Sequence, residues 1–196
     1  MNDETNGLKK LVEKKARQHG KFILASGIEA TRYFDLKQVL FDPEGANLIG
    51  NIMFESIKGM GVEAVGGYGL GAGLITSSIV LKSKLLKKPI YGFEVIEREK
   101  LDEDDPQRYE DETETYVIKG NLPLVGSKVA IVDDVISTGA AIFRAIGIIE
   151  GKGYKVAKVR AILDRQLGGS KELQRKGYDF RAILRADAFG KIYINK

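Results

Sequence analysis

Cysteine is absent from this sequence, and histidine occurs only once, as His19. The absence of cysteine excludes disulfides, thiolate zinc sites and cysteine nucleophiles, and a single histidine excludes a metal site built from several imidazoles. No apolar run reaches the roughly 18 residues that a membrane-spanning helix needs, and the segment Met1–Gly7 is polar. We therefore expect a cytoplasmic protein without a signal peptide and without a membrane partner.

Length and charge narrow the class of protein further. The 196 residues, 43% of them apolar, suit one domain over 1–196 with a real core. The segment Glu97–Thr115 carries ten acidic and three basic residues, a net charge of −7, so the rest of the chain carries +11. A basic body suits an anionic ligand. Nucleic acid is not an expected partner, because the basic residues are scattered rather than grouped with aromatic ones.

Strand-like and helix-like segments alternate along the chain, which indicates an α/β fold with a mostly parallel central sheet flanked by helices. The expected helices are 6–19, 43–58, 71–87, 139–151 and 170–176. The expected extended segments are 21–25, 31–40, 62–66, 90–96, 116–118, 129–133, 155–163 and 180–185. Segment 97–115 is too polar to pack and is expected to be a mobile excursion. Ligands of such sheets bind at the carboxyl ends of the strands.

The stretch 128–141 reads K-V-A-I-V-D-D-V-I-S-T-G-A-A. An apolar strand ends at two adjacent carboxylates, Asp133 and Asp134, and a Ser137-Thr138-Gly139 turn precedes a helical pattern. The carboxylates suit sugar hydroxyls or a metal ion, and the backbone N–H groups at a helix start suit a phosphate. The pattern therefore predicts a site for a sugar phosphate.

Three other interpretations of this stretch are weaker. A receiver domain would need about 100 further residues, whereas 69 remain from Lys128 onward. A nucleotidase Walker B strand would need G-x-x-x-x-G-K-[ST] upstream, and the interval between Gly120 and Gly126 is wrong for that motif. A plain strand–turn–helix with an aspartate cap would not require two acids.

Residues 129–141 resemble the phosphoribosyl-pyrophosphate (PRPP) signature of type I phosphoribosyltransferases. The resemblance implies that the two acids hold the ribose hydroxyls and act in catalysis, and that the following loop wraps the 5′-phosphate. It also implies a small N-terminal hood and a flexible hairpin beside the sheet. The PRPP contacts implied here are Asp133, Asp134, Val135, Ile136, Ser137, Thr138, Gly139, Ala140 and Ala141.

Two further stretches are similar to orotate phosphoribosyltransferases. Residues 19–35, H-G-K-F-I-L-A-S-G-I-E-A-T-R-Y-F-D, resemble the family's base-binding hood, here 1–40, in which two aromatic residues cover the pyrimidine. Residues 163–165, L-D-R, resemble an element whose arginine pairs with orotate. The implied orotate contacts are Ser26, Tyr33, Phe34, Ser137 and Arg165. Taken singly, Tyr33 and Phe34 are equally compatible with core aromatics, and Arg165 with a surface charge at a strand end.

The glycine-rich stretch 66–73, G-G-Y-G-L-G-A-G, follows an expected strand and opens an expected helix, where a phosphate can bind. The resemblance makes Tyr68, Gly69, Leu70 and Gly71 a pyrophosphate loop, although some family members carry lysine at the position of Leu70. A dinucleotide fingerprint is the alternative, with Glu94 placed to bind a ribose. That alternative leaves the aspartate pair without a role.

The acidic segment 97–115 departs from the family pattern. Orotate phosphoribosyltransferases carry a basic lid here, with an arginine-lysine pair, a further lysine and a histidine. Counted without gaps from Phe93, these fall on Ile96, Glu97, Lys100 and Asp102. Lys100 is thus the implied catalytic cation over the leaving pyrophosphate, and Arg98 is a second implied PRPP contact if the alignment shifts. A solvated hairpin without a catalytic part is the alternative.

The resemblance implies transfer of the 5-phosphoribosyl group from PRPP to orotate, which yields orotidine 5′-monophosphate and pyrophosphate in pyrimidine biosynthesis. It implies Mg²⁺ held mainly by PRPP and water, with no direct protein ligand, and a homodimer. Three alternatives remain open. They are a phosphoribosyltransferase acting on another base, a PRPP-binding regulator without orotate turnover, and a dinucleotide-binding module.

Overall fold

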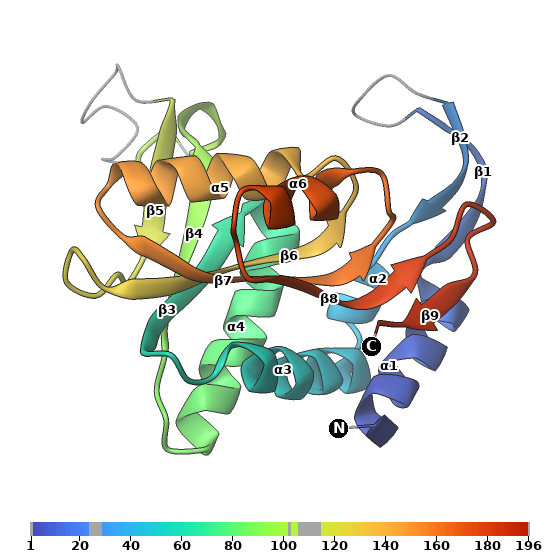
Figure 1. Cartoon of the computed structure of the whole chain (residues 1–196), viewed down its shortest axis with the longest axis horizontal. Helices are drawn as coiled ribbons and strands as arrows, with labels where there is room; N and C mark the ends of the chain where they lie inside the picture. The colour runs from blue at the N-terminus through green and yellow to red at the C-terminus, as the bar shows by residue number, and fades with distance from the viewer. Residues whose placement is uncertain (1, 24–28, 102, 106–114, 196) are drawn as a thin grey trace.

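The structure is a computed structural model that describes residues 2–23, 29–101, 103–105 and 115–195. Its centre is a seven-stranded sheet of order β5-β4-β3-β6-β7-β8-β9 (Figure 1). The strands are β3 (Val62–Tyr68), β4 (Tyr91–Glu97), β5 (Tyr116–Gly120), β6 (Lys128–Ile136), β7 (Lys155–Asp164), β8 (Phe180–Ala186) and β9 (Ile192–Ile194). The five inner strands are parallel, and the edge strands β5 and β9 are antiparallel to their neighbours. The predicted α/β fold with a mostly parallel sheet is confirmed.

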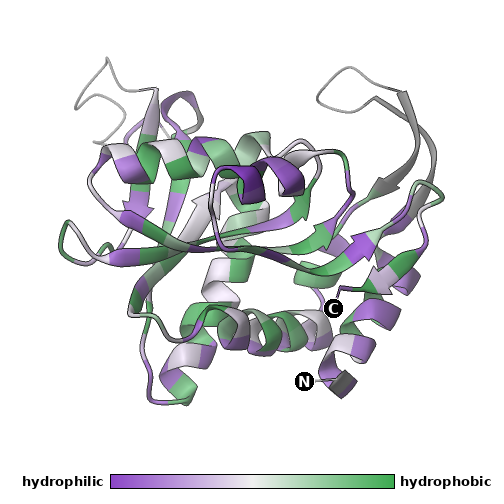
Figure 2. Cartoon of the chain, in the orientation of Figure 1, coloured by the Kyte–Doolittle hydropathy of each residue, from purple (hydrophilic) through white to green (hydrophobic). Residues whose placement is uncertain are grey.

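Helices cover both faces of this sheet (Figure 1). One face packs against α1 (Asn2–Lys15), α2 (Lys37–Leu40), α3 (Pro43–Ile57) and α4 (Gly69–Leu85), and the other against α5 (Ala140–Gly151) and α6 (Gly169–Arg175). Along β6, Ala130 and Val132 join the first core, whereas Val129 and Ile131 join the second. A strand buried on both faces needs a continuous apolar run rather than an alternating one. Figure 2 shows this hydrophobic colouring along the central strands and α3, and hydrophilic colouring over most of α6.

A separate two-stranded sheet, β1 (Arg17–Ile23) and β2 (Glu29–Phe34), extends from the body near α2 and β9 (Figure 1). Several predicted boundaries here are wrong, since the first helix and the two strands all begin earlier than expected, and two of the differences have a clear cause. The first helix ends at Lys15 rather than at residue 19, because the buried Ala16 accepts a hydrogen bond from Asp35 N (2.9 Å) and the chain then pairs with β2. The extended segment ends at Phe34 rather than at residue 40, because the Asp35 carboxylate accepts a hydrogen bond from Lys37 N (3.2 Å) where α2 begins.

Two further differences concern strands. β6 continues to Ile136, three residues beyond the predicted end, because it stays paired with β7 as far as Asp164. β9 was not predicted, since three residues after a turn give too short a pattern to recognise. Within the described ranges, no helix combines the length and the apolar character needed to cross a bilayer.

Strand register brings the chemically interesting residues to one edge of the sheet. Gly66 on β3 lies beside Ile131 on β6, so Tyr68 and Asp133 follow at the same level. Asp133 lies beside Ala161 on β7, which ends at Asp164. The carboxyl ends of β3, β6 and β7 therefore meet where α/β sheets bind ligands.

Candidate active site

The two aspartates of β6 form the centre of this edge. Asp133 is only 8% exposed, and its Oδ1 accepts a hydrogen bond from Asp134 N (2.9 Å). Asp134 is partly exposed, and its Oδ1 accepts a hydrogen bond from Val135 N (2.8 Å). These backbone donors fix both carboxylates while leaving further oxygen lone pairs able to accept hydrogen bonds from a ligand.

Burial, reinforced by the adjacent Asp134 carboxylate, raises the pKa of Asp133 well above its usual value of 3.8. The native protein therefore holds this proton more tightly than the unfolded chain does. Consequently the free energy of unfolding should fall as the pH rises from the unfolded pKa through the native pKa of Asp133. A carboxylate kept at such a cost to stability is typical of a functional site.

The Asp133→Asn variant is expected to be more stable than the wild type at neutral pH, because it removes the buried charge but keeps the side-chain shape. It should also lack the pH-dependent loss of stability that Asp133 causes. Chemical denaturation of both proteins over a series of pH values measures the effect. Parallel stability profiles would contradict the proposed titration of Asp133.

Residues 137–141, which are the connection between β6 and α5 together with the first two residues of α5, have the geometry of a phosphate-binding turn. Gly139 adopts a left-handed conformation (φ 85°) at the N-cap of α5 and, as a glycine, has no side chain that could cap the helix. The first N–H groups of α5 thus lack partners within the helix and can donate to an anion. All the predicted phosphate contacts from Ser137 to Ala141 lie at this turn.

A residue that the sequence motifs do not include supports this turn from behind. Gly169 begins α6, and its N–H donates to Ser137 O (3.0 Å). A Cβ atom at Gly169 would lie 2.6 Å from Gly139 N and 2.6 Å from Thr138 C. The backbone of α6 therefore packs directly on the loop, with no space for a side chain. The glycine pair at 168–169 was the only local signal of this contact.

The second predicted loop, Tyr68–Gly71, reaches the aspartate pair. Gly69 is left-handed (φ 77°) and begins α4, whose N-cap residue Tyr68 provides no side-chain cap. A Cβ atom at Gly71 would lie 2.7 Å from Asp134 Cγ. The N-terminus of α4, the N-terminus of α5 and one carboxylate therefore converge, which allows a ligand with two phosphate groups and a sugar to be held between them.

The structure describes only some of the residues that were predicted to contact the base. Ser26 lies outside the described residues, and so does the Tyr33 side chain. Phe34 is 5% exposed and packs in the core with α1 and α3, as the core-aromatic alternative expects. Arg165 is partly exposed at the end of β7, and its N–H donates to Ile136 O (2.9 Å). Arg165 thus lies near the aspartate pair, and its contact with a base stays a prediction.

The acidic segment is described only near its ends. Arg98 begins a short 3₁₀ helix, η1 (Arg98–Lys100), and its N–H donates to Thr115 O (2.9 Å), so β4 and β5 stay together at the base of the segment. The Lys100 side chain and residues 102 and 106–114 lie outside the described residues. The catalytic role of Lys100 therefore stays a prediction.

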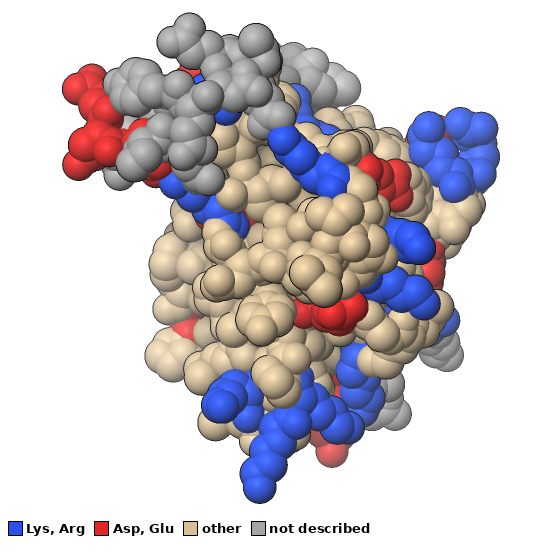
Figure 3. Space-filling view, turned by 90° about the vertical axis from the view of Figure 1, so that its left-hand side faces the viewer, with Lys and Arg blue, Asp and Glu red and all other residues tan. Residues whose placement is uncertain are grey.

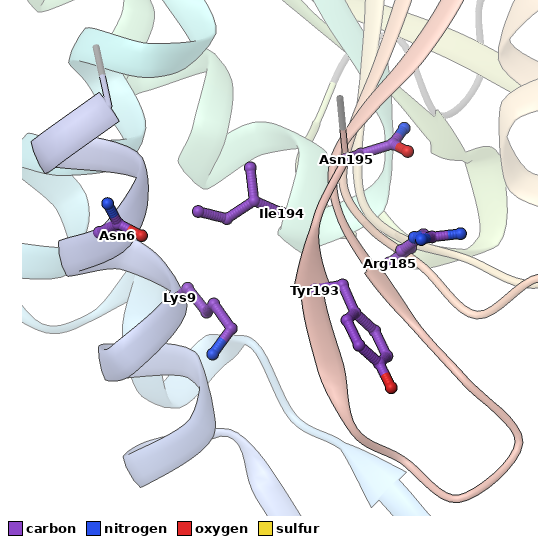
Figure 4. A pocket seen from close by; sticks show the side chains of 6 residues that line it. All are labelled: Asn6, Lys9, Arg185, Tyr193, Ile194 and Asn195. Carbon is purple, nitrogen blue, oxygen red and sulfur yellow. The ribbon is translucent and has the colours of Figure 1, made fainter.

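A cavity of about 550 Å³ lies elsewhere, between α1 and β9 (Figure 4). It is lined by Asn6, Lys9, Arg185, Tyr193, Ile194 and Asn195. None of these belongs to the predicted site, which is instead formed at the carboxyl ends of β3 and β6.

Curated relatives and solved structures both indicate the same family of enzymes, although no protein-family model matches the sequence. The orotate phosphoribosyltransferase of Rhodopirellula baltica is 33% identical over 186 residues, which cover 92% of this chain and 91% of the relative. That of Aquifex aeolicus is 31% identical over 185 residues, which cover 93% and 95%. The crystal structure of Mycobacterium tuberculosis H37Rv orotate phosphoribosyltransferase in complex with PRPP is similar with a TM-score of 0.71, at 25% identity and with coverage of 93% and 96%.

Proposed function

Because the chain belongs to the orotate phosphoribosyltransferase family, within the type I phosphoribosyltransferases, we propose that it transfers the 5-phosphoribosyl group from PRPP to orotate. The products are orotidine 5′-monophosphate and pyrophosphate, and the reaction serves pyrimidine biosynthesis. The observation that carries this proposal is the convergence of Asp134, the start of α4 and the start of α5 at one sheet edge.

In the proposed reaction, the bond between ribose C1 and a pyrophosphate oxygen breaks, and a bond from C1 to orotate N1 forms. Positive charge develops on the ribose and negative charge on the pyrophosphate. Asp133 and Asp134 would accept hydrogen bonds from the ribose hydroxyls. The N–H groups of loop 137–141 would hold the 5′-phosphate and those of 68–71 the pyrophosphate. The chain's contribution is thus orientation and charge stabilisation by fixed groups.

The carboxylate oxygens at the carboxyl end of β6 suit Mg²⁺ as ligands. The ion retains several waters and binds through one or two carboxylates together with substrate phosphates. Asp133 and Asp134 lie where PRPP is proposed to bind, and no group of three or more metal-ligating side chains occurs in the parts of the chain that the structure describes. PRPP oxygens and water would therefore be the main ligands, with the aspartates nearby. When bound, Mg²⁺ would neutralise charge on the pyrophosphate.

We propose that orotate is held by Ser26, Tyr33, Ser137 and Arg165, with residues 1–40 forming the hood of one domain over 1–196. Phe34 is left out of this proposal, because its ring is buried in the core and is not accessible to a base. An arginine fork suits a planar carboxylate or imide. Lys100 is the proposed cation for the leaving pyrophosphate, and Arg98 is a second proposed contact. Reaction in the cytoplasm would agree with a chain in which no described helix can cross a membrane.

A PRPP-binding protein without turnover is the second candidate function. It is favoured by the acidic segment 97–115 and by the Glu97 carboxylate, which accepts a hydrogen bond from Tyr68 beside the proposed pyrophosphate loop. Orotate consumption with PRPP and Mg²⁺, followed by absorbance, separates the two candidates. Turnover supports the transferase. PRPP binding without turnover of orotate would support the second candidate. Turnover of another base would show that the enzyme transfers the phosphoribosyl group to that base instead of orotate.

We also propose a homodimer formed through α4. This helix is apolar on two sides. Ile75 and Ile79 are buried in the core, whereas Leu70, Leu81 and Leu85 are 54%, 63% and 69% exposed and recur along one stripe. Exposed apolar stripes on a surface helix are typical of interfaces. Figure 3 shows the side of the molecule that carries β5, where a broad uncharged area has basic side chains along its lower edge.

The Leu81→Asp variant is expected to be monomeric, because it places a charge in the proposed interface. Phe189→Asp is the matched control, since Phe189 is also exposed but lies between β8 and β9. Light scattering at several protein concentrations gives the molar masses. A monomeric wild type, or a Leu81→Asp variant that remains dimeric, would contradict this interface.

A further inference from the structure

One cluster of side chains links four elements at the edge of the proposed pyrophosphate loop. Tyr68 is the last residue of β3 and directly precedes Gly69. Glu97 ends β4, and its partner across the sheet is Tyr116, the first residue of β5. Arg144 extends from α5, five residues after Gly139. Arg144 lies outside the motifs of the sequence, and the proposed reaction does not use it.

The guanidinium of Arg144 lies over two aromatic rings. Its Cζ atom is 4.9 Å from the ring centroid of Tyr68 and 5.3 Å from that of Tyr116. The two rings are 6.2 Å apart and nearly perpendicular, at 76°. The distances of 4.9 and 5.3 Å from Cζ to the two ring centroids are within the range of cation–π attraction, so Arg144 helps to fix the Tyr68 ring.

The same guanidinium approaches Glu97. Arg144 Nη1 is 3.6 Å from Glu97 Oε1, which also accepts a hydrogen bond from the Tyr68 hydroxyl. At that separation the Arg144–Glu97 contact is a charge attraction rather than a hydrogen bond. Arg144 is 39% exposed and Glu97 27% exposed, so solvent screens the pair only in part.

The Glu97 carboxylate lies close to the proposed pyrophosphate loop, so the positive charge of Arg144 beside it matters for binding. The carboxylate accepts a hydrogen bond from the hydroxyl of Tyr68, which is the first residue of the loop proposed to bind pyrophosphate. Without a cation beside it, a negative charge there would repel the phosphates of PRPP as the substrate binds. With Arg144 in place, the Tyr68–Glu97–Arg144 cluster carries no net charge.

We propose that Arg144 is a positioning residue for PRPP, which neutralises Glu97 and fixes Tyr68 at the entrance of loop 68–71. This inference rests on the proposed function and adds a residue to it. Arg144 acts through Glu97 and Tyr68 and makes no proposed contact with the substrate. Its removal should therefore affect PRPP and pyrophosphate, which carry the phosphates, and not orotate.

The test compares Arg144→Met with the wild type in PRPP titrations with Mg²⁺ and in initial rates. We expect the PRPP dissociation constant and KM to rise about tenfold, with the orotate KM unchanged and kcat within about threefold. Arg144→Lys, which keeps the charge, should stay within about threefold of the wild type. Arg175→Met is the control, because Arg175 pairs with Glu172 on the surface of α6.

The double variant Arg144→Met/Glu97→Gln separates charge from packing. If the Glu97 charge weakens PRPP binding once Arg144 is removed, removing that charge as well should restore the dissociation constant to within about threefold of the wild type. Unchanged PRPP affinity in Arg144→Met, equal losses for PRPP and orotate, or no rescue in the double variant would each overturn the inference. A wild type that fails to bind PRPP would instead overturn the proposed function, and this inference with it.

Discussion

The Asp134→Asn variant is expected to bind PRPP about 100-fold more weakly than the wild type, with a similar loss in kcat/KM. Hydrogen bonds to a charged acceptor contribute about 1.5–3 kcal/mol each, and asparagine keeps the shape but not the charge. Because the amide oxygen can still accept the hydrogen bond from Val135 N, the local backbone should be preserved. Calorimetry and initial rates measure the two losses.

The matched control for this substitution is Glu63→Gln. Glu63 is exposed near the amino end of β3, at the edge of the sheet opposite the site. This variant should bind PRPP as the wild type does. An Asp134→Asn protein with wild-type PRPP affinity would show that the aspartate does not hold the ribose.

The Gly169→Ala variant is expected to lower kcat/KM for PRPP by about 100-fold, although Gly169 makes no proposed contact with substrate. Its new methyl group would lie 2.6 Å from two backbone atoms of the phosphate loop, Gly139 N and Thr138 C. Backbone cannot move aside as a flexible side chain does, so α6 or the loop must shift. A displacement of about 1 Å in a positioned group can cost about 100-fold in rate.

Gly147→Ala provides the control for this prediction. Gly147 lies within α5, and a Cβ atom there would meet nothing within 4 Å. Alanine should therefore stabilise the helix by about 0.5–1 kcal/mol and leave the rates unchanged. Thermal unfolding of both variants separates a local effect from loss of fold. A folded Gly169→Ala protein with full activity would contradict the supporting role of α6.

Much of the fold was predictable because its signals are local. The apolar run of β6, the aspartate pair and the following turn lie within 14 consecutive residues, and the structure places the turn at the start of α5. The glycine-rich stretch likewise lies at the start of α4. Strands that are buried on both faces appear in the sequence as continuous apolar segments, and such segments favour a parallel sheet.

The contacts that were not predicted join residues distant in the sequence. Gly169 packs on Gly139, and Arg144 lies over Tyr68 and beside Glu97. Gly169 and Arg144 belong to none of the motifs of the sequence, and the glycine pair at 168–169 is the only local signal of either contact. The boundary between α1 and β1 was also set by a distant partner, since Asp35 pairs with Ala16.

The proposed function depends most on one interaction, in which the aspartate pair and the turn after it hold the phosphoribosyl part of PRPP. Calorimetric titration of the wild-type protein with PRPP in the presence of Mg²⁺ tests it most directly. We expect saturable binding of one PRPP per chain, with the affinity falling about 100-fold in Asp134→Asn. A titration in which the folded wild-type protein shows no binding of PRPP would contradict it.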